Sequence, residues 1–180
     1  MNINKFLIFF IIAAIIIYSY SVAIAVEDVD TQTSIVSLTV PPSCRLSISS
    51  PNITKTLSQG GEIEAAFDAG YIDFSASTPI LTVSANKGWD LSVKATNFTG
   101  PYSKSVADLK LKDASVSGHV TKGFNNFTPL ALTDQGIASY TGPVKNESHP
   151  LQYRIILDWA KDIPGTYTAT VTYTLSTNAS

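Results

Sequence analysis

The chain has 180 residues, of which 44% are apolar, with 12 Lys and Arg against 14 Asp and Glu, a formal net charge of −2 and one cysteine. This length suits one ordinary domain and excludes a large multidomain enzyme. The slightly acidic balance provides no extended basic surface for a phosphate backbone, so we expect no nucleic-acid partner. A single cysteine, Cys44, excludes an intrachain disulfide and is expected to be a structural thiol within a strand.

The first 25 residues predict a secretory signal peptide. Lys5 precedes an unbroken apolar run over residues 6–17, and Ala23 and Ala25 supply the small residues that a signal peptidase reads. The run is shorter than the roughly 20 residues of a membrane-spanning helix, although residues 18–26 could extend it into a retained anchor. We expect cleavage after Ala25, an extracellular or cell-surface location and no transmembrane segment in the mature chain.

The mature chain predicts an all-β fold, because about a quarter of it is Ser or Thr and a period of two dominates its apolar pattern. The alternation is strictest near the carboxyl end, where five threonines alternate with apolar or aromatic residues. No helix is expected after the leader. About nine strands are predicted, over residues 34–40, 44–49, 70–76, 80–85, 89–95, 109–112, 137–140, 151–157 and 166–175.

Turn signals separate these strands. Asn86-Lys87-Gly88 is a three-residue loop ending in glycine, which predicts a hairpin between the strands on either side. Pairs of proline and glycine mark most of the other turns. We therefore predict a flexible segment over residues 26–33, followed by a single antiparallel two-sheet β-sandwich of the immunoglobulin-like type over residues 34–180.

The sequence offers little catalytic chemistry. Neither His119 nor His149 has a metal-ligand spacing, and we expect both to be solvated in loops. Asp158 and Asp162 could share a calcium ion, but the interpretation that we favour is capping of the turn before the last strand. No Gly-x-Ser-x-Gly, Ser-x-x-Lys or phosphate-binding glycine loop occurs in the sequence. We predict a non-enzymatic protein with no metal and no cofactor.

The aromatic residues allow two interpretations. Trp89 shares the apolar parity of its strand with Leu91, and Tyr173 shares that of the last strand with Leu175. The first interpretation is that both rings are core anchors packed between the sheets. In the second, one ring is partly exposed at a sheet end and stacks on a sugar ring, so that these four residues are the candidate ligand-binding set. Trp159 is expected to be a buried or rim aromatic.

Two segments resemble the paired motifs of WxL-domain proteins, surface proteins of Gram-positive bacteria whose domain attaches non-covalently to the cell wall. The first is Gly-Trp-Asp-Leu-Ser-Val over residues 88–93, with Phe98 downstream. The second is residues 165–176, similar to the family's carboxy-terminal strand with Tyr173 in place of its second Trp and without the trailing Pro. The resemblance covers roughly residues 34–176. It implies a non-catalytic protein that associates with cell-wall polymer or with other surface proteins.

The start of the mature domain leaves a different function open. Residues 34–49 contain a hydrophobic strand pair joined by Pro41-Pro42, which could donate an edge strand to a neighbouring molecule. The chain would then be a structural subunit of a fimbria or surface layer that self-associates by strand exchange. Both hypotheses predict a non-catalytic cell-surface protein, and they differ in the partner.

Overall fold

The computed structural model describes residues 32–57, 60–74, 78–118 and 120–178. The chain divides into two units, residues 1–39 and 40–180. Residues 32–39 of the first unit form neither helix nor strand. The predicted leader, its cleavage site after Ala25 and residues 26–31 lie outside the described part.

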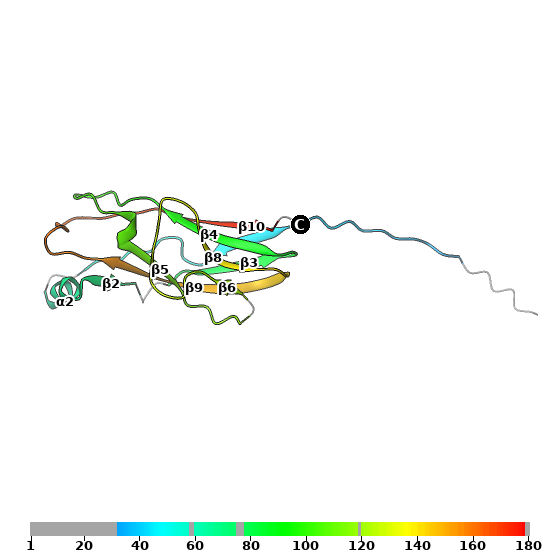
Figure 1. Ribbon diagram of the computed structural model, residues 1–180, viewed down its shortest axis with the longest axis horizontal. Helices are drawn as coiled ribbons and strands as arrows, with labels where there is room; N and C mark the ends of the chain where they lie inside the picture. Colours follow the sequence, from blue (N-terminus) through cyan, green and yellow to red (C-terminus); the bar gives the residue numbers. More distant parts are fainter. Residues whose placement is uncertain (1–31, 58–59, 75–77, 119, 179–180) are drawn as a thin grey trace, which may run out of the picture. The chain divides into compact units, whose positions relative to one another are not determined.

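The second unit is a sandwich of two antiparallel sheets (Figure 1). One sheet has the order β1-β3-β9-β5-β7, with β2 also paired to β9, and the other has the order β10-β4-β8-β6. The predicted all-β two-sheet sandwich is therefore confirmed. Its strands are β1 Cys44–Ile48, β2 Tyr71–Asp73, β3 Ile80–Ala85, β4 Trp89–Ala95, β5 Leu109–Asp113, β6 Thr121–Lys122, β7 Thr128–Pro129, β8 Gln135–Tyr140, β9 Val144–Ile156 and β10 Val171–Thr177.

The core lies between the sheets and is built by strands whose alternate side chains point inward. Along β4 the burial alternates strictly, with the apolar residues buried and Asp90 and Lys94 exposed. The same period of two occurs in β3 and β5. Because successive side chains of a strand point to opposite faces, this pattern fixes which face of each sheet meets the other sheet. The fully buried apolar residues are Leu81, Val83, Trp89, Leu91, Val93, Leu111, Ile137 and Leu151.

The predicted hairpin around residues 86–88 is wrong. Strands β3 and β4 have the predicted bounds, but they belong to different sheets, so the turn carries the chain from one layer to the other. Two hydrogen bonds hold Asn86 toward β1. Its backbone nitrogen donates to the Ser43 carbonyl over 3.1 Å, and its side-chain Nδ2 donates to the Pro41 carbonyl over 2.8 Å. On the other side of the turn, the Gly88 carbonyl accepts from the Asn178 nitrogen over 2.8 Å. The end of β3 is therefore bonded toward β1, whereas the start of β4 is bonded toward the residue that follows β10.

Further elements differ from expectation. The strand predicted over residues 166–175 is observed as β10 Val171–Thr177, and the short strands β6 and β7 were not predicted. Residues 34–40 were expected to form a strand, but they pair with none of the described residues and remain outside both sheets. A helix that was not expected, α2 Gly61–Ala69, precedes β2 and ends at Gly70 in the left-handed conformation, with φ of 74°. Glutamates in its first turn and the terminal glycine are ordinary helix signals. A 3-10 turn, η1 Val106–Asp108, leads into β5.

Candidate functional site

The two motif strands of the sequence are neighbours in space. Strands β4 and β10 pair antiparallel, and Leu175 lies directly opposite Leu91. Tyr173 lies opposite Val93, and Trp89 lies opposite Thr177. The structure thus places all four predicted ligand-binding residues on one face of two adjacent strands, and this face is the one that meets the core.

Burial decides what these residues can contact. Trp89 and Leu91 are 0% exposed, so neither offers a surface on which a sugar ring could stack. The Trp89 ring meets the edge of the His149 ring, with centroids 5.8 Å apart and planes at 82°. Leu175 and Tyr173 are half-buried against the core because β10 is an edge strand. The arrangement fits the core-anchor interpretation of Trp89.

A hydrogen bond joins the two sheets between Tyr173 of β10 and Tyr153 of β9. Their hydroxyl oxygens contact one another directly. Burial raises the pKa of Tyr153 to about 12, against the smaller opposing effect of the hydrogen bond from Tyr173. Burial raises the pKa of Tyr173 further, and the nearby Tyr153 adds to the shift. Both phenols therefore stay neutral at physiological pH, and they act as a structural link and not as a proton donor to solvent.

His149 was expected to be solvated in a loop, and this prediction is wrong. It lies within β9 and is 0% exposed, and its Nδ1 is 2.8 Å from Oδ2 of Asp113, whose side chain is equally buried. The other carboxylate oxygen of Asp113 accepts from the Ser115 backbone nitrogen over 2.9 Å. A histidine in a strand can be a core residue when a buried carboxylate faces it. Sequence spacing gives no sign of this pairing, because His149 and Asp113 are 36 positions apart.

The Asp113 carboxylate is ionised in the folded protein. Burial alone raises its pKa, but the hydrogen bonds from His149 and Ser115 together with the charge interaction with His149 outweigh burial and lower the pKa below 3.8. His149 Nε2 has no hydrogen-bond partner among the described residues and lies in the interior beside Trp89. The pair is therefore enclosed in the core, with both side chains 0% exposed.

Asp158 and Asp162 do not form an open cation site. Asp162 faces Lys104 with both of its oxygens, at 2.8 and 2.7 Å from Nζ, and both side chains are only 5% exposed. The same carboxylate accepts from the Asp158 backbone nitrogen over 2.9 Å, which is the predicted capping of this turn. Asp158 itself pairs with Lys161. Among the described residues, no group of three or more histidine, cysteine or acidic side chains could hold a metal ion.

Trp159 is a rim aromatic and is 60% exposed. Its ring stacks on Phe67 of α2 with centroids 4.5 Å apart, and its Nε1 donates to Asp68 over 3.1 Å. These contacts attach α2 to the turn before β10. The described part of the chain contains no helix long and apolar enough to cross a bilayer.

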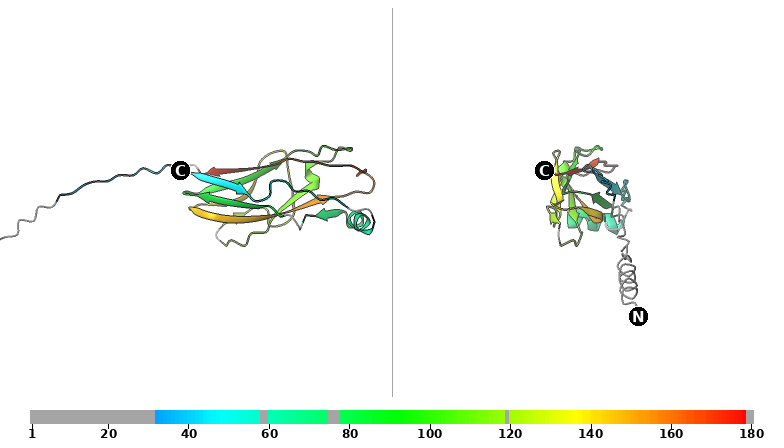
Figure 2. Two further views of the ribbon diagram at one scale, coloured as in Figure 1. Left: turned by 180° about the vertical axis from the view of Figure 1, so that it is seen from behind. Right: turned by 90° about the vertical axis from the view of Figure 1, so that its right-hand side faces the viewer.

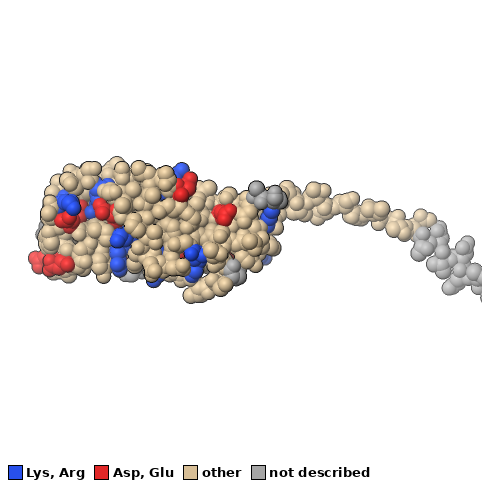
Figure 3. All heavy atoms as spheres, in the orientation of Figure 1, with Lys and Arg blue, Asp and Glu red and all other residues tan. Residues whose placement is uncertain are grey.

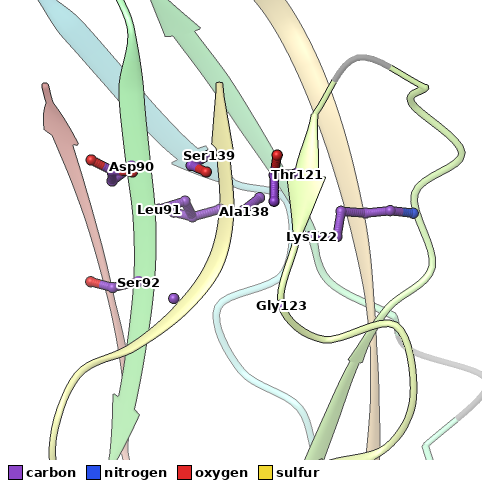
Figure 4. A pocket seen from close by; sticks show the side chains of 9 residues that line it. Asp90, Leu91, Ser92, Thr121, Lys122, Gly123, Ala138 and Ser139 are labelled. Carbon is purple, nitrogen blue, oxygen red and sulfur yellow. The ribbon is translucent and has the colours of Figure 1, made fainter. Parts of the chain in front are cut away.

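A hollow of about 250 Å³ lies between β4, β6 and β8 (Figure 4). Hydroxyl side chains and Asp90 line its polar side, and Lys122 lies at its β6 border. Gly123 lets β6 approach β8, because a Cβ at this position would lie 2.2 Å from the Gly136 carbonyl oxygen. Elsewhere charges are sparse, and Figure 3 shows them scattered singly or in small mixed groups over the visible face.

The apolar surface of the chain is concentrated before β1. Ile35, Val36, Leu38 and Val40 are 90%, 92%, 85% and 65% exposed. A run of aliphatic side chains that is open to water marks an interaction site more often than a neutral surface. The sequence pattern predicted a strand here, whereas the structure assigns neither helix nor strand to residues 34–40.

Two strands have a free edge on the same side of the sandwich. Strand β1 ends the larger sheet and β10 ends the smaller one. The two lie side by side across the layers (Figure 2, left), and the Cys44 sulfur approaches the Leu175 carbonyl oxygen at 3.8 Å. Cys44 is thus an exposed thiol within an edge strand.

No protein-family model matches this chain, and no curated protein matches it either. The resemblance of residues 88–93 and 165–176 to the motifs of WxL-domain proteins therefore stays a prediction.

Proposed function

We propose that this chain is a non-catalytic structural subunit of a cell surface, exported by its amino-terminal leader, which assembles by donating residues 34–40 as a strand to a neighbouring molecule. The observation that carries the proposal is the exposure of the aliphatic side chains of this segment, between 65% and 92%. Adding a strand to a sheet edge is a common way for proteins to associate, with affinity from backbone hydrogen bonds and specificity from alternate side chains.

The segment has the properties of a strand that is waiting for a partner. Val36, Leu38 and Val40 share one parity, so they would face the same way in a strand. Ser37 and Thr39 share the other parity with Ile35, so that face is polar except at its start. Burying one such aliphatic side chain contributes about 1.5–3 kcal/mol, so three of them offer several kcal/mol toward association. No charged residue occurs over residues 31–44 to oppose pairing.

The chemistry of the core supports a structural role. The histidine–carboxylate pair of His149 and Asp113 has no exposed side-chain surface. The buried lysine, Lys104, is neutralised by Asp162. Each of these groups is buried and faces an oppositely charged or hydrogen-bonding side chain, which favours a role in stabilising the fold.

The test is the assembly state of the chain from Val26 to Ser180. We expect sedimentation velocity to show species that grow with protein concentration. The double variant Val36→Asp with Leu38→Asp should be monomeric, because a strand with two buried charges cannot dock. Ser37→Asp is the matched control, since it adds a charge on the mostly polar parity and should leave assembly intact. A wild-type chain that is monomeric at every concentration would overturn the proposal.

A second candidate, retention on cell-wall polymer, is the function that the resemblance to WxL-domain proteins implies. The observation that favours it is the hollow between β4, β6 and β8, which Ser92, Thr121 and Ser139 line together with Asp90. Its test is a pull-down with purified cell walls beside a control polysaccharide. Ser139→Tyr, which fills the hollow, should reduce retention, whereas Thr174→Tyr on the outer face of β10 should not. Equal retention of both variants would exclude the hollow.

A further inference from the structure

We infer that the acceptor for residues 34–40 is the free edge of β10 on a second copy of this chain. The inference rests on the proposed strand donation and names the partner and the surface that it uses. It does not use β1, the other free edge on this side of the sandwich.

The hydrogen-bond pattern shows which backbone groups of β10 are available. Thr170 accepts from the Thr96 nitrogen over 2.9 Å, and the Asn178 nitrogen donates to Gly88 over 2.8 Å. The even-numbered residues of this segment therefore bond toward β4. In an antiparallel ladder the odd-numbered residues then direct their N–H and C=O groups away from that partner. Val171 and Tyr173 thus present donors and acceptors at the free edge.

The same edge leaves the core incompletely covered. Along β4, every inward side chain is buried, whereas the inward residues of its neighbour β10 are only half-buried. The half-burial continues upstream through Tyr167 and Ala169. Strand β1, which lies beside β10 on the opposite sheet, has five residues and meets it near Leu175. An added strand with inward aliphatic side chains would bury the surface that remains open.

Strand β10 also lacks the features by which edge strands usually avoid pairing. Proteins protect such edges with proline, lysine, bulges or very short strands. Residues 166–177 contain no charge, no proline and no glycine. Strand β1 differs, because it is short, carries Arg45 and is flanked by Pro41-Pro42 and Pro51. This contrast is the reason to assign the acceptor to β10.

Donor and acceptor match in chemistry. Both are uncharged and both alternate aliphatic or aromatic residues with Ser and Thr. Docking Val36, Leu38 and Val40 inward would extend the row that Val171 and Tyr173 begin. Since no ion pair contributes, assembly should change little between low and moderate salt.

The experiment uses complementary variants of the chain from Val26 to Ser180. Ala169→Pro blocks the acceptor, because the Ala169 nitrogen lies between Thr168 and Thr170, both bonded toward the β4 side, and so faces the free edge. The donor variant is Val36→Asp with Leu38→Asp. We expect each to be monomeric alone and an equimolar mixture to form a heterodimer that grows no further, since one variant can only donate and the other can only accept. Ile48→Pro, the matched block on the free edge of β1, should assemble like the wild type.

Three outcomes would exclude β10 as the acceptor without excluding strand donation itself. They are wild-type assembly by Ala169→Pro, a mixture that stays monomeric, and loss of assembly in folded Ile48→Pro. If Ala169→Pro does not fold, amide hydrogen exchange replaces it. The Val171 and Tyr173 amides should exchange slowly in the assembled wild type and rapidly in the donor variant. Protection of the Leu46 and Ile48 amides instead would assign the edge to β1. A wild-type chain that never assembles would reject the proposed function itself.

Discussion

The buried pair of Asp113 and His149 allows the sharpest test of how this core is stabilised. We consider His149→Phe, which keeps an aromatic ring of similar shape against Trp89 but removes the partner of the carboxylate. The distance of 2.8 Å between Nδ1 and Oδ2 and the complete burial of both side chains leave no water to replace the histidine. Asp113 would keep its bond from the Ser115 nitrogen at 2.9 Å.

The expected cost follows from the charge that remains. Removing the partner of a buried carboxylate costs about 3–5 kcal/mol, because the charge that remains stays desolvated. Domains of this kind have a free energy of unfolding of about 5–15 kcal/mol, so the variant would be marginal. For 150 to 250 residues each kcal/mol shifts the melting temperature by about 2–4 °C, which gives a drop of about 6–20 °C.

The assay is urea unfolding followed by far-ultraviolet circular dichroism, since tryptophan fluorescence would respond directly to the ring that Trp89 contacts. The double variant Asp113→Asn with His149→Phe is the control. Its neutral amide can still accept from Ser115, so it should recover at least half of the lost free energy. A cost below about 1 kcal/mol for His149→Phe, or a double variant no more stable than the single one, would contradict a buried carboxylate that depends on His149.

Four further predictions concern the fold and the leader. The lowered pKa of Asp113 contributes stability that is complete above its ordinary value of 3.8 and is lost as pH falls through the folded value. The urea concentration at the midpoint of unfolding should therefore decrease as the pH is lowered below about 5. In Asp113→Asn this decrease should be less steep. Trp89→Ala should cost about 3–5 kcal/mol and melt the domain in calorimetry, and a stable variant would remove Trp89 from the core. Val171→Asp should cost several kcal/mol in urea unfolding, and Thr170→Asp much less; equal costs would reverse the strand's parity. Amino-terminal sequencing of exported protein should begin at Val26, whereas an intact Met1 in the membrane fraction would indicate an anchor.

The strands that were predicted best are those whose pattern reflects burial on one face. Residues 80–85 and 89–95 have the predicted bounds because each alternates between the core and the outside. The pairing of these strands could not be predicted, since a turn between sheets and a hairpin turn use the same residues. Asn86 decides between them through bonds to Pro41 and Ser43, which lie more than 40 positions away.

The errors in the candidate site have the same origin. His149 is polar in sequence, and only its neighbour across the fold, Asp113, makes burial possible. Trp89 and Leu91 were recognised as a pair with Tyr173 and Leu175 because all four share a strand parity. A period of two shows that one side of a strand is apolar. Whether that side faces the core or a ligand depends on which sheet covers it, and the period does not show this.

The uncharged free edge of β10 carries a risk of nonspecific pairing, and this risk bears on the proposed assembly. An uncharged edge with alternating Thr and apolar residues can pair with many strands, including another β10 edge, and such pairing leads to aggregation. Backbone hydrogen bonds alone would not discriminate, because every strand offers them. Selectivity must come from the inward side chains, where small Ala169 lies between the larger Tyr167 and Val171. A donor that places Val36, Leu38 and Val40 over this row would bury aliphatic surface. Specific assembly is therefore expected to depend on the size of the residue at position 169.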